Sequence, residues 1–312
     1  MRFFLPVLLS LAAVLPVTAQ NENPTPMQAW QYPYEVHHLE LADSLRLAYV
    51  DEGAGAYTLL FIHGLGSNLQ AWQKNIDVLK ANYRCIALDL PGYGKSSRGA
   101  YPFDMPFFAR AVRHFIDHLA LENVVLVGHS MGGQIAVHTV LNSPERLAKL
   151  LLLAPAGFET FSQEERDWFQ NFYTSAVVKA TPEDQIIKNF HLNFHQFPDD
   201  AQFMIDDRLL LRQSSEYDDY CQMIPRCVQG MLQYPIFDQL PELNLPTLIL
   251  YGAEDALIPN TYLHPQLTTP QVARAGQERI AGSQLRLLPA AGHFVQWEQA
   301  AAVNAAIVEY LQ

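Results

Sequence analysis

Short apolar segments rich in Val, Ile and Leu recur along the chain, and segments with helical periodicity separate them. Eight of the apolar segments have the length and composition of β-strands: EVHHLEL (35–41), LRLAYVD (45–51), TLLFIHG (58–64), RCIALDL (84–90), NVVLVGH (123–129), KLLLLAP (149–155), TLILYGA (247–253) and QLRLLPA (284–290). The later segments are almost continuously apolar, which is typical of parallel strands covered on both faces. The first two are less so, which predicts an antiparallel hairpin at one edge of the sheet.

The segments between the strands supply the helices that such a sheet needs. Four of them carry apolar residues at helical spacing: 69–80, 104–120, 131–142 and 298–311. In the second, Asp104 is placed to cap the helix and Pro106 falls in its first turn. Alternating strands and helices predict an α/β core with an eight-stranded, mostly parallel sheet, built from residues 36–157 and 242–312.

One segment, 158–241, breaks the alternation. It holds few strand-like runs and many aromatic residues. It is too long for a loop, so we expect a helical cap inserted between two strands. An insertion at the end of a parallel strand lies over the carboxyl edge of the sheet, where such folds bind ligands. Its aromatics fit an apolar substrate site and ordinary helix packing equally well.

Composition narrows the class of protein. The chain has 312 residues, of which 49% are hydrophobic and 17% charged, as in ordinary globular proteins. There are 32 acidic and 20 basic residues, a net charge of −12, and no basic cluster. This argues against a nucleic-acid partner and against an anionic membrane surface, since both are bound through Lys and Arg. No apolar run reaches the roughly 18–20 residues of a spanning helix, so stable membrane insertion is not expected.

The N-terminus resembles an export signal. Arg2 precedes an apolar stretch over 3–17, and the small residues of Val17-Thr18-Ala19 suit a signal peptidase. The pattern predicts a signal peptide over 1–19 and a secreted or periplasmic protein. Residues 20–35 are polar and rich in Pro, so we expect an exposed segment there.

Export affects how the three cysteines are interpreted. Cys85 lies in an apolar run and is expected to be an inert core residue. Cys221 and Cys227 are close in sequence, and an oxidising compartment would allow a disulfide between them. Spacing alone does not decide between a disulfide and two free thiols.

The sharpest motif is Gly128-His129-Ser130-Met131-Gly132, a G-x-S-x-G sequence between a predicted strand and a predicted helix. In this context the strand-to-helix turn is tight and exposes the serine side chain. The two outer glycines remove side chains that would collide in the turn. The following helix directs its N-terminus at the site, which favours developing negative charge. Ser130 is therefore the candidate nucleophile.

A serine hydroxyl needs a base, and the base needs an orienting carboxylate. The best-placed of the eleven histidines is His293, in the loop after strand 284–290, where we expect it to be exposed. Asp255 follows strand 247–253, with Glu254 as its main competitor. The alternative position for the acid, after strand 149–155, holds no carboxylate. The order Ser130, Asp255, His293 is the order that this type of site uses.

Acyl transfer also requires donors for the oxyanion. The backbone N–H of Met131, directly after the nucleophile, is one candidate. The N–H of Leu65, between Gly64 and Gly66 in the loop after strand 58–64, is the other. His63, just before this loop, is better explained as a structural hydrogen-bonding residue than as a proton carrier.

With these pieces in place, the chain resembles the α/β-hydrolase superfamily. The matching segments are FIHGLGSN (61–68), LDLPGYGKSS (88–97), LVGHSMGGQIA (126–136), LYGAEDALIP (250–259) and AAGHFVQWE (290–298). The resemblance implies eight strands, a helical cap, Ser-His-Asp acyl chemistry and no cofactor or metal. The serine departs from haloalkane dehalogenases and epoxide hydrolases, which use Asp at that position. Meta-cleavage C–C hydrolases are similar in Gln296-Trp297-Glu298 but more often carry Asn in place of His129. The stretch 259–282 is longer than in many relatives and is expected to hold an added helix.

These observations predict a secreted serine hydrolase that acts on carboxylic esters through an acyl-enzyme on Ser130, with a small-molecule substrate. A C–C bond, lactone or amide hydrolase on the same three residues is the alternative. A ligand-binding protein with little turnover is the alternative of a different kind, since fold alone does not prove activity. The presence of a full triad and both oxyanion loops favours an enzyme.

Overall fold

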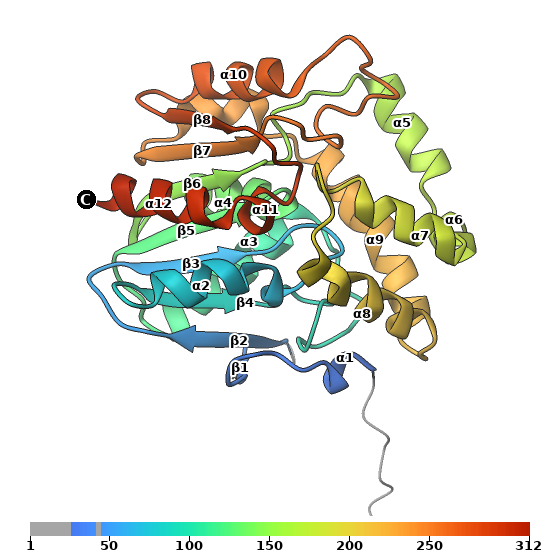
Figure 1. Ribbon diagram of the computed structural model, residues 1–312, viewed down its shortest axis with the longest axis horizontal. Coiled ribbons are helices and arrows are strands. Elements are labelled where there is room, and N and C mark those ends of the chain that lie inside the picture. Colours follow the sequence, from blue (N-terminus) through green and yellow to red (C-terminus); the bar gives the residue numbers. More distant parts are fainter. Residues whose placement is uncertain (1–25, 42–44) are drawn as a thin grey trace, which may run out of the picture.

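The computed structural model describes residues 26–41 and 45–312, so the predicted signal peptide lies outside the described residues. It contains one eight-stranded sheet, in the order β1-β2-β4-β3-β5-β6-β7-β8 (Figure 1). The strands are β1 (His37–Glu40), β2 (Arg46–Glu52), β3 (Thr58–Ile62), β4 (Arg84–Leu88), β5 (Val124–His129), β6 (Leu147–Leu153), β7 (Thr247–Gly252) and β8 (Gln284–Leu288). Each lies within two residues of its predicted limits. The predicted fold class is therefore confirmed.

The strand directions follow the hydrophobic pattern. β1 pairs antiparallel with β2, and β2 pairs antiparallel with β4. All other pairs, from β4–β3 to β7–β8, are parallel. The predicted antiparallel hairpin at one edge is confirmed. Because most strands are parallel, their carboxyl ends share one edge of the sheet.

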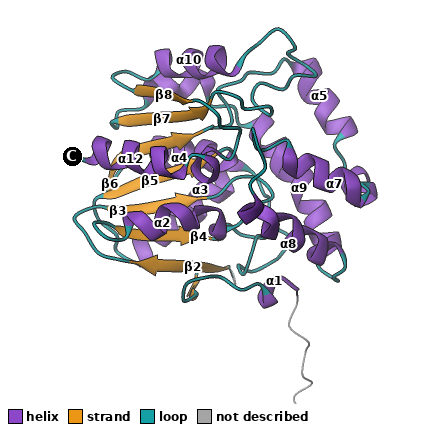
Figure 2. Cartoon of the chain, viewed as in Figure 1, coloured by secondary structure: helices purple, strands orange, loops and turns teal. Residues whose placement is uncertain are grey.

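Helices cover both faces of the sheet (Figures 1 and 2). On one face lie η2 (Leu69–Trp72), α2 (Gln73–Leu79) and α12 (Ala300–Leu311); on the other lie α3 (Met105–His118), α4 (Met131–Asn142) and α10 (Thr269–Arg279). The strands alternate between these two cores: in β3, Phe61 packs with the first set and Leu60 with the second. Asp104 caps α3 by accepting the Phe107 N–H at 2.8 Å, as predicted.

Between β6 and β7 the chain forms a group of helices, the cap helices. They are α5 (Gln163–Phe172), α6 (Ser175–Ala180), α7 (Glu183–His191), η3 (Asp199–Ala201), α8 (Gln202–Arg212), α9 (Tyr217–Gln233) and η4 (Phe237–Glu242). In Figure 1, α5 to α9 lie beside the sheet at the edge toward which the parallel strands point. This places them over the edge where the sequence predicts the site. Within the described ranges, no helix has both the length and the apolar character needed to span a bilayer.

The expectation of an exposed segment over 20–35 is wrong at two positions. Met27, in the short helix α1 (Pro26–Ala29), is 3% exposed, and Trp30 is 8% exposed. Both belong to the main apolar core, and α1 packs beside α8. The polar, Pro-rich composition did not reveal that two apolar side chains anchor this segment to the core.

The three cysteines are free. Cys221 and Cys227 are both buried in α9. Six residues along one helix separate Cα atoms by about 9 Å along the axis, which is beyond the roughly 7 Å that a disulfide spans. Of the two interpretations, the structure therefore supports free thiols.

Candidate active site

Ser130 sits in a strained turn between β5 and α4. Its φ of 54° and ψ of −120° are unusual for a residue with a side chain. A Cβ added to Gly128 would lie 2.4 Å from the Gly132 carbonyl oxygen, and one added to Gly132 would lie 2.3 Å from the Ile62 oxygen. Only glycine fits at these two positions, as the motif predicts. The turn leaves Ser130 half-buried, at the carboxyl edge of the sheet.

The structure brings Asp255 and His293 together. His293 Nδ1 donates to Asp255 Oδ2 over 2.8 Å. The second oxygen of Asp255 accepts the N–H groups of Leu257 and Ile258 at 2.8 and 3.1 Å, which fixes the carboxylate. The His293 side chain is only 5% exposed, so the expectation of an exposed imidazole is wrong. Because an ionised carboxylate only accepts, the proton of a neutral His293 ring resides on Nδ1, and Nε2 is unprotonated.

The competing carboxylate has another role. Glu254 accepts the Ala291 N–H at 3.2 Å and so ties the loop after β7 to the loop after β8. The pair of carboxylates is thus divided, with Asp255 against the imidazole and Glu254 against the backbone.

His129 links the serine turn to the histidine loop. Its Nε2 donates to the His293 carbonyl oxygen at 2.9 Å, and the two rings lie 4.8 Å apart. Burial holds the pKa of His129 well below its usual value, so its ring is neutral. Because Ser130 directly follows His129, this contact brings the serine turn against the loop that carries His293.

The predicted oxyanion loop lies against Ser130. A Cβ on Gly64 would be 3.1 Å from the Ser130 Cβ, so the chain passes the nucleophile as closely as glycine allows. The N–H groups of Leu65 and Met131 donate to no acceptor among the described residues. The Met131 N–H belongs to the first turn of α4, where helix N–H groups have no intrahelical partner.

His63 is a structural residue, as the sequence suggested. Its Nε2 accepts the Leu90 N–H at 3.1 Å, so its proton is on Nδ1, which donates to the Gly64 oxygen at 2.8 Å. Burial lowers the pKa of His63 to about 4. The neutral ring therefore joins the end of β4 to the start of the oxyanion loop.

Glu298 was noted in the sequence but given no role there. Its carboxylate accepts three backbone N–H groups: Gly292 at 2.7 Å, His195 at 3.0 Å and Gln196 at 2.6 Å. Gly292 directly precedes His293, and the other two lie between α7 and η3. Glu298, at the end of α11 (Val295–Glu298), thus fastens the histidine loop to the cap.

A cavity of about 240 Å³ lies under the cap helices. Its walls include Leu65 of the oxyanion loop, Phe294 next to His293, and Trp30 of the N-terminal segment. Asp207 and Arg208 of α8 add one acidic and one basic side chain. Burial, assisted by the charge of a neighbouring aspartate, raises the pKa of Asp207 to about 7. The cavity wall does not include Ser130, Asp255 or His293. It does include Leu65 of the oxyanion loop and Phe294, which directly follows His293.

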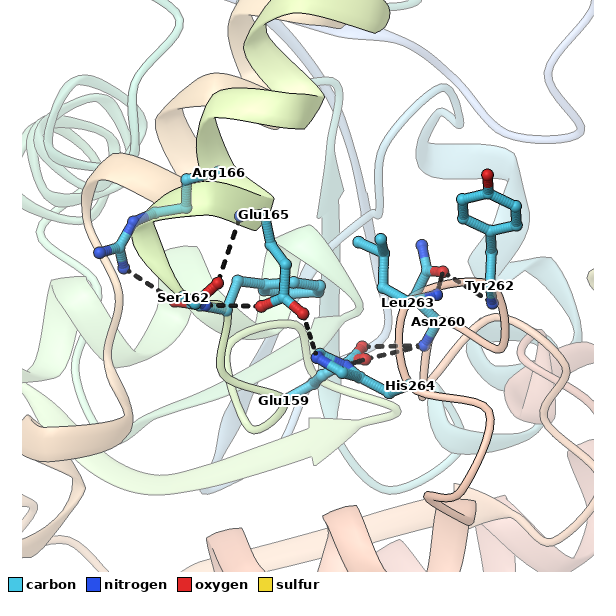
Figure 3. Close-up of polar contacts among 9 residues, drawn as sticks. Glu159, Ser162, Glu165, Arg166, Asn260, Tyr262, Leu263 and His264 are labelled. Atoms are coloured by element: carbon cyan, nitrogen blue, oxygen red, sulfur yellow. Dashed lines mark hydrogen bonds and ion pairs between the residues drawn. The ribbon is translucent and has the colours of Figure 1, made fainter.

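A second polar cluster joins the start of the cap to the loop after β7 (Figure 3). His264 donates through Nδ1 to Glu159 at 2.5 Å and through Nε2 to Glu165 at 3.0 Å. Glu159 also accepts the Asn260 N–H at 2.9 Å. Burial opposes a charge on His264, but the two carboxylates outweigh it and raise the pKa of His264. His264 lies in the long stretch 259–282, which also contains the expected added helix, α10.

Comparison with known proteins agrees with this architecture. The profile of a family described as alpha/beta hydrolase fold matches residues 57–300. The chain therefore belongs to the alpha/beta hydrolase fold family. A probable hydrolytic enzyme from Pseudomonas aeruginosa PAO1 superposes with a TM-score of 0.81 and 24% identity, covering 92% of this chain and 98% of that one. At this identity the likeness supports the fold alone.

Two curated relatives illustrate the range of the family. The 2-hydroxy-6-oxononadienedioate/2-hydroxy-6-oxononatrienedioate hydrolase of Escherichia coli is 30% identical over 285 residues, covering 87% of this chain and 93% of the relative. The dihydrolipoyllysine-residue acetyltransferase component of the acetoin cleaving system of Cupriavidus necator is 29% identical over 274 residues. That match covers 86% of this chain and 67% of the relative, so the chain spans about two thirds of that protein's length.

Proposed function

We propose that the protein is a serine hydrolase of small carboxylic esters. The observation that carries the proposal is the linked set of Ser130 in its strained turn, His293 bonded to Asp255, and two backbone N–H groups beside the serine that donate to no described acceptor. A binding protein would have no chemical need for all of these features together.

The reaction starts with attack of the Ser130 oxygen on the ester carbonyl carbon. His293 Nε2 takes the serine proton, and Asp255 stabilises the resulting imidazolium. The N–H groups of Leu65 and Met131 donate to the oxyanion of the tetrahedral intermediate. Collapse expels the alcohol, which receives the proton from His293 and leaves an acyl-enzyme. Water, activated by the same imidazole, then adds to the acyl carbon and forms a second tetrahedral intermediate. Collapse of this intermediate releases the acid, and His293 returns the proton to Ser130.

The cavity supports an ester with one apolar group. Most of its wall is aromatic or aliphatic, and its volume of about 240 Å³ suits a small molecule. A C–C hydrolase is the second candidate, because the 2-hydroxy-6-oxononadienedioate/2-hydroxy-6-oxononatrienedioate hydrolase of Escherichia coli is 30% identical over most of both chains. The two candidates share the same three residues and differ in the bond that is cleaved.

The test compares p-nitrophenyl esters of short and medium chain length with a ring-fission dienoate, using wild type and Ser130→Ala. Ester turnover that disappears in Ser130→Ala, together with labelling of wild type by a fluorophosphonate, supports the proposal. Turnover of the dienoate at a kcat/KM well above that of every ester would favour the C–C hydrolase. Absence of both turnover and labelling would refute the serine mechanism.

We also propose that the protein is exported. The support is the pattern of charge, apolar stretch and small residues over 1–19. N-terminal sequencing of protein recovered from the periplasm or the medium should find Gln20 as the first residue. Recovery of cell-retained protein that starts at Met1 would contradict export.

A further inference from the structure

The oxyanion loop is held by a side chain from outside the loop. Gly66 directly follows Leu65 and has a positive φ of 67°. Its carbonyl oxygen accepts Nη2 of Arg208 at 2.5 Å, across 142 residues of sequence. A side chain of the cap therefore holds the backbone of the oxyanion loop one residue after Leu65.

Arg208 is itself fixed among the cap helices. Its guanidinium lies over the ring of Tyr220 of α9 at 4.2 Å and over the ring of Phe190 of α7 at 5.4 Å. A Cβ on Gly66 would be 3.2 Å from Arg208 Nη2 and 3.3 Å from the Tyr220 hydroxyl oxygen. The loop and the guanidinium thus meet at a distance that a larger residue than glycine would disturb.

No carboxylate within 4 Å pairs with Arg208 in the described part of the chain. Its neighbour Asp207 has a pKa raised to about 7 by burial, which weakens it as a counter-ion near neutral pH. The charge of Arg208 is instead directed at one carbonyl and two aromatic faces. A planar guanidinium suits this arrangement, because it can stack and donate at the same time.

We propose that Arg208 is a positioning residue that helps to fix the direction of the Leu65 N–H by holding the Gly66 carbonyl, two peptide groups further along the loop. The proposal rests on the proposed function, because it assigns that N–H to the oxyanion. It couples the cap to catalysis, because a displacement of α8 moves the Gly66–Ser67 peptide and, through the backbone of Gly66 and Leu65, the peptide that carries the Leu65 N–H. Both acylation and deacylation pass through an oxyanion, so both steps depend on this contact.

The chain offers a matched control on the same helix. Arg212 also donates to a backbone carbonyl, that of Thr181, and lies over the ring of Tyr217 at 5.9 Å. It does not contact the oxyanion loop. Arg208→Met removes the donor and keeps an apolar stem, Arg208→Lys keeps a charge but loses the planar stack, and Arg212→Met removes the comparable contact within the cap.

The experiment measures kcat and KM for a p-nitrophenyl ester and the inhibition constant of a boronic acid that forms a tetrahedral adduct. Loss of a whole oxyanion donor costs about 10²–10³ in kcat. A misdirected donor should cost part of that, so we expect kcat of Arg208→Met to fall about 10–100-fold with KM nearly unchanged. The inhibition constant of the boronic acid should rise by a similar factor. Arg208→Lys should lie between, and Arg212→Met should match wild type.

Three results would overturn the proposal. A raised KM with unchanged kcat would make Arg208 a substrate contact in the cavity. An equal loss in Arg212→Met would indicate general loosening of the cap. Unchanged kinetics in Arg208→Met would show that the oxyanion loop keeps its active conformation without the contact to Arg208.

Hydrogen exchange separates this proposal from the proposed function. Amides of residues 64–68 should exchange faster in Arg208→Met than in wild type or Arg212→Met, whether or not the protein turns over esters. Equal exchange in all three would refute the positioning role. If wild type neither cleaves esters nor reacts with a fluorophosphonate, the ester hydrolase proposal fails, and with it the catalytic role of Arg208. Faster exchange in Arg208→Met would still show that Arg208 holds the loop.

Discussion

Glu298 provides the most informative single perturbation, because one carboxylate holds three backbone N–H groups from two parts of the chain. The bond to the Gly292 N–H is partly buried, while those to the His195 and Gln196 N–H groups are exposed. A buried hydrogen bond to a charged group contributes about 1.5–3 kcal/mol, and each exposed one, which water can replace, about 0.5–1 kcal/mol. Glu298→Ala should therefore lower the free energy of unfolding by about 2.5–5 kcal/mol.

Glu298→Gln distinguishes the hydrogen bonds from the side chain as such. The amide keeps one acceptor oxygen, and its best orientation leaves that oxygen on Gly292 and His195, where Oε2 accepts both N–H groups. The NH₂ group then faces Gln196, so one exposed bond is lost, at about 1 kcal/mol. Because Gly292 precedes His293, we expect kcat to fall about 10–100-fold in Glu298→Ala, since displacements near 1 Å can cost that much.

The assay is denaturant unfolding with an unchanged m-value, combined with ester kinetics. Glu309→Ala is the control, because Glu309 forms only an exposed ion pair with Arg286. It should leave both the unfolding midpoint and kcat at their wild-type values. Equal stabilities for Glu298→Ala and Glu298→Gln, or wild-type kcat in Glu298→Ala, would refute the reasoning.

Three further predictions follow from other contacts. Asp255→Asn should lower kcat about 10³–10⁴-fold with little change in thermal stability, because the imidazole loses its anionic partner; steady-state kinetics within tenfold of wild type would contradict the assignment. Gly276→Ala places a Cβ 2.0 Å from the ring of buried Phe158, so despite the better helix propensity we expect a net loss of about 1–2 kcal/mol and a lower Tm, whereas Ala275→Ser, one residue earlier, should leave Tm unchanged. Since its two carboxylate partners raise the pKa of His264 above 6.5, its stabilisation is full below pH 6.5 and is lost as the pH rises through the raised pKa. The stability gap between wild type and His264→Gln, measured by denaturant unfolding, should thus be larger at about pH 6 than at about pH 9, and an equal gap at both would disprove the charged state.

The strands and core helices were predictable because each carries its own periodic signal. β5 is buried at every position and begins with four consecutive apolar residues, since helices cover both of its faces, and α3 shows its cap and its apolar stripe within one segment. The serine turn was predictable for a related reason. Only glycine fits at positions 128 and 132 of this tight turn, and the whole requirement lies within five consecutive residues.

What the sequence did not reveal depends on contacts between distant segments. Arg208 meets Gly66 across 142 residues, and the acceptor is a carbonyl oxygen that every residue possesses. Trp30 lies in a polar segment, yet it is buried and forms part of the cavity wall. His293 is buried, with the rings of His129 and Phe294 beside it, which its position on a loop did not indicate. Only Glu298 had a visible signal, in the Gln296-Trp297-Glu298 sequence.

Three of the polar contacts between the cap and the core involve loops beside the site: Glu165 with His264, the loop after α7 with Glu298, and Arg208 with Gly66. On the core side they involve three different segments, which follow β7, β8 and β3 respectively. A chimera that grafts residues 158–241 onto another hydrolase would therefore have to carry His264 and Glu298 with it, and would need a backbone carbonyl where Gly66 presents its own. Directed evolution of the cap alone would explore pocket shape only within the limits that these three core residues impose.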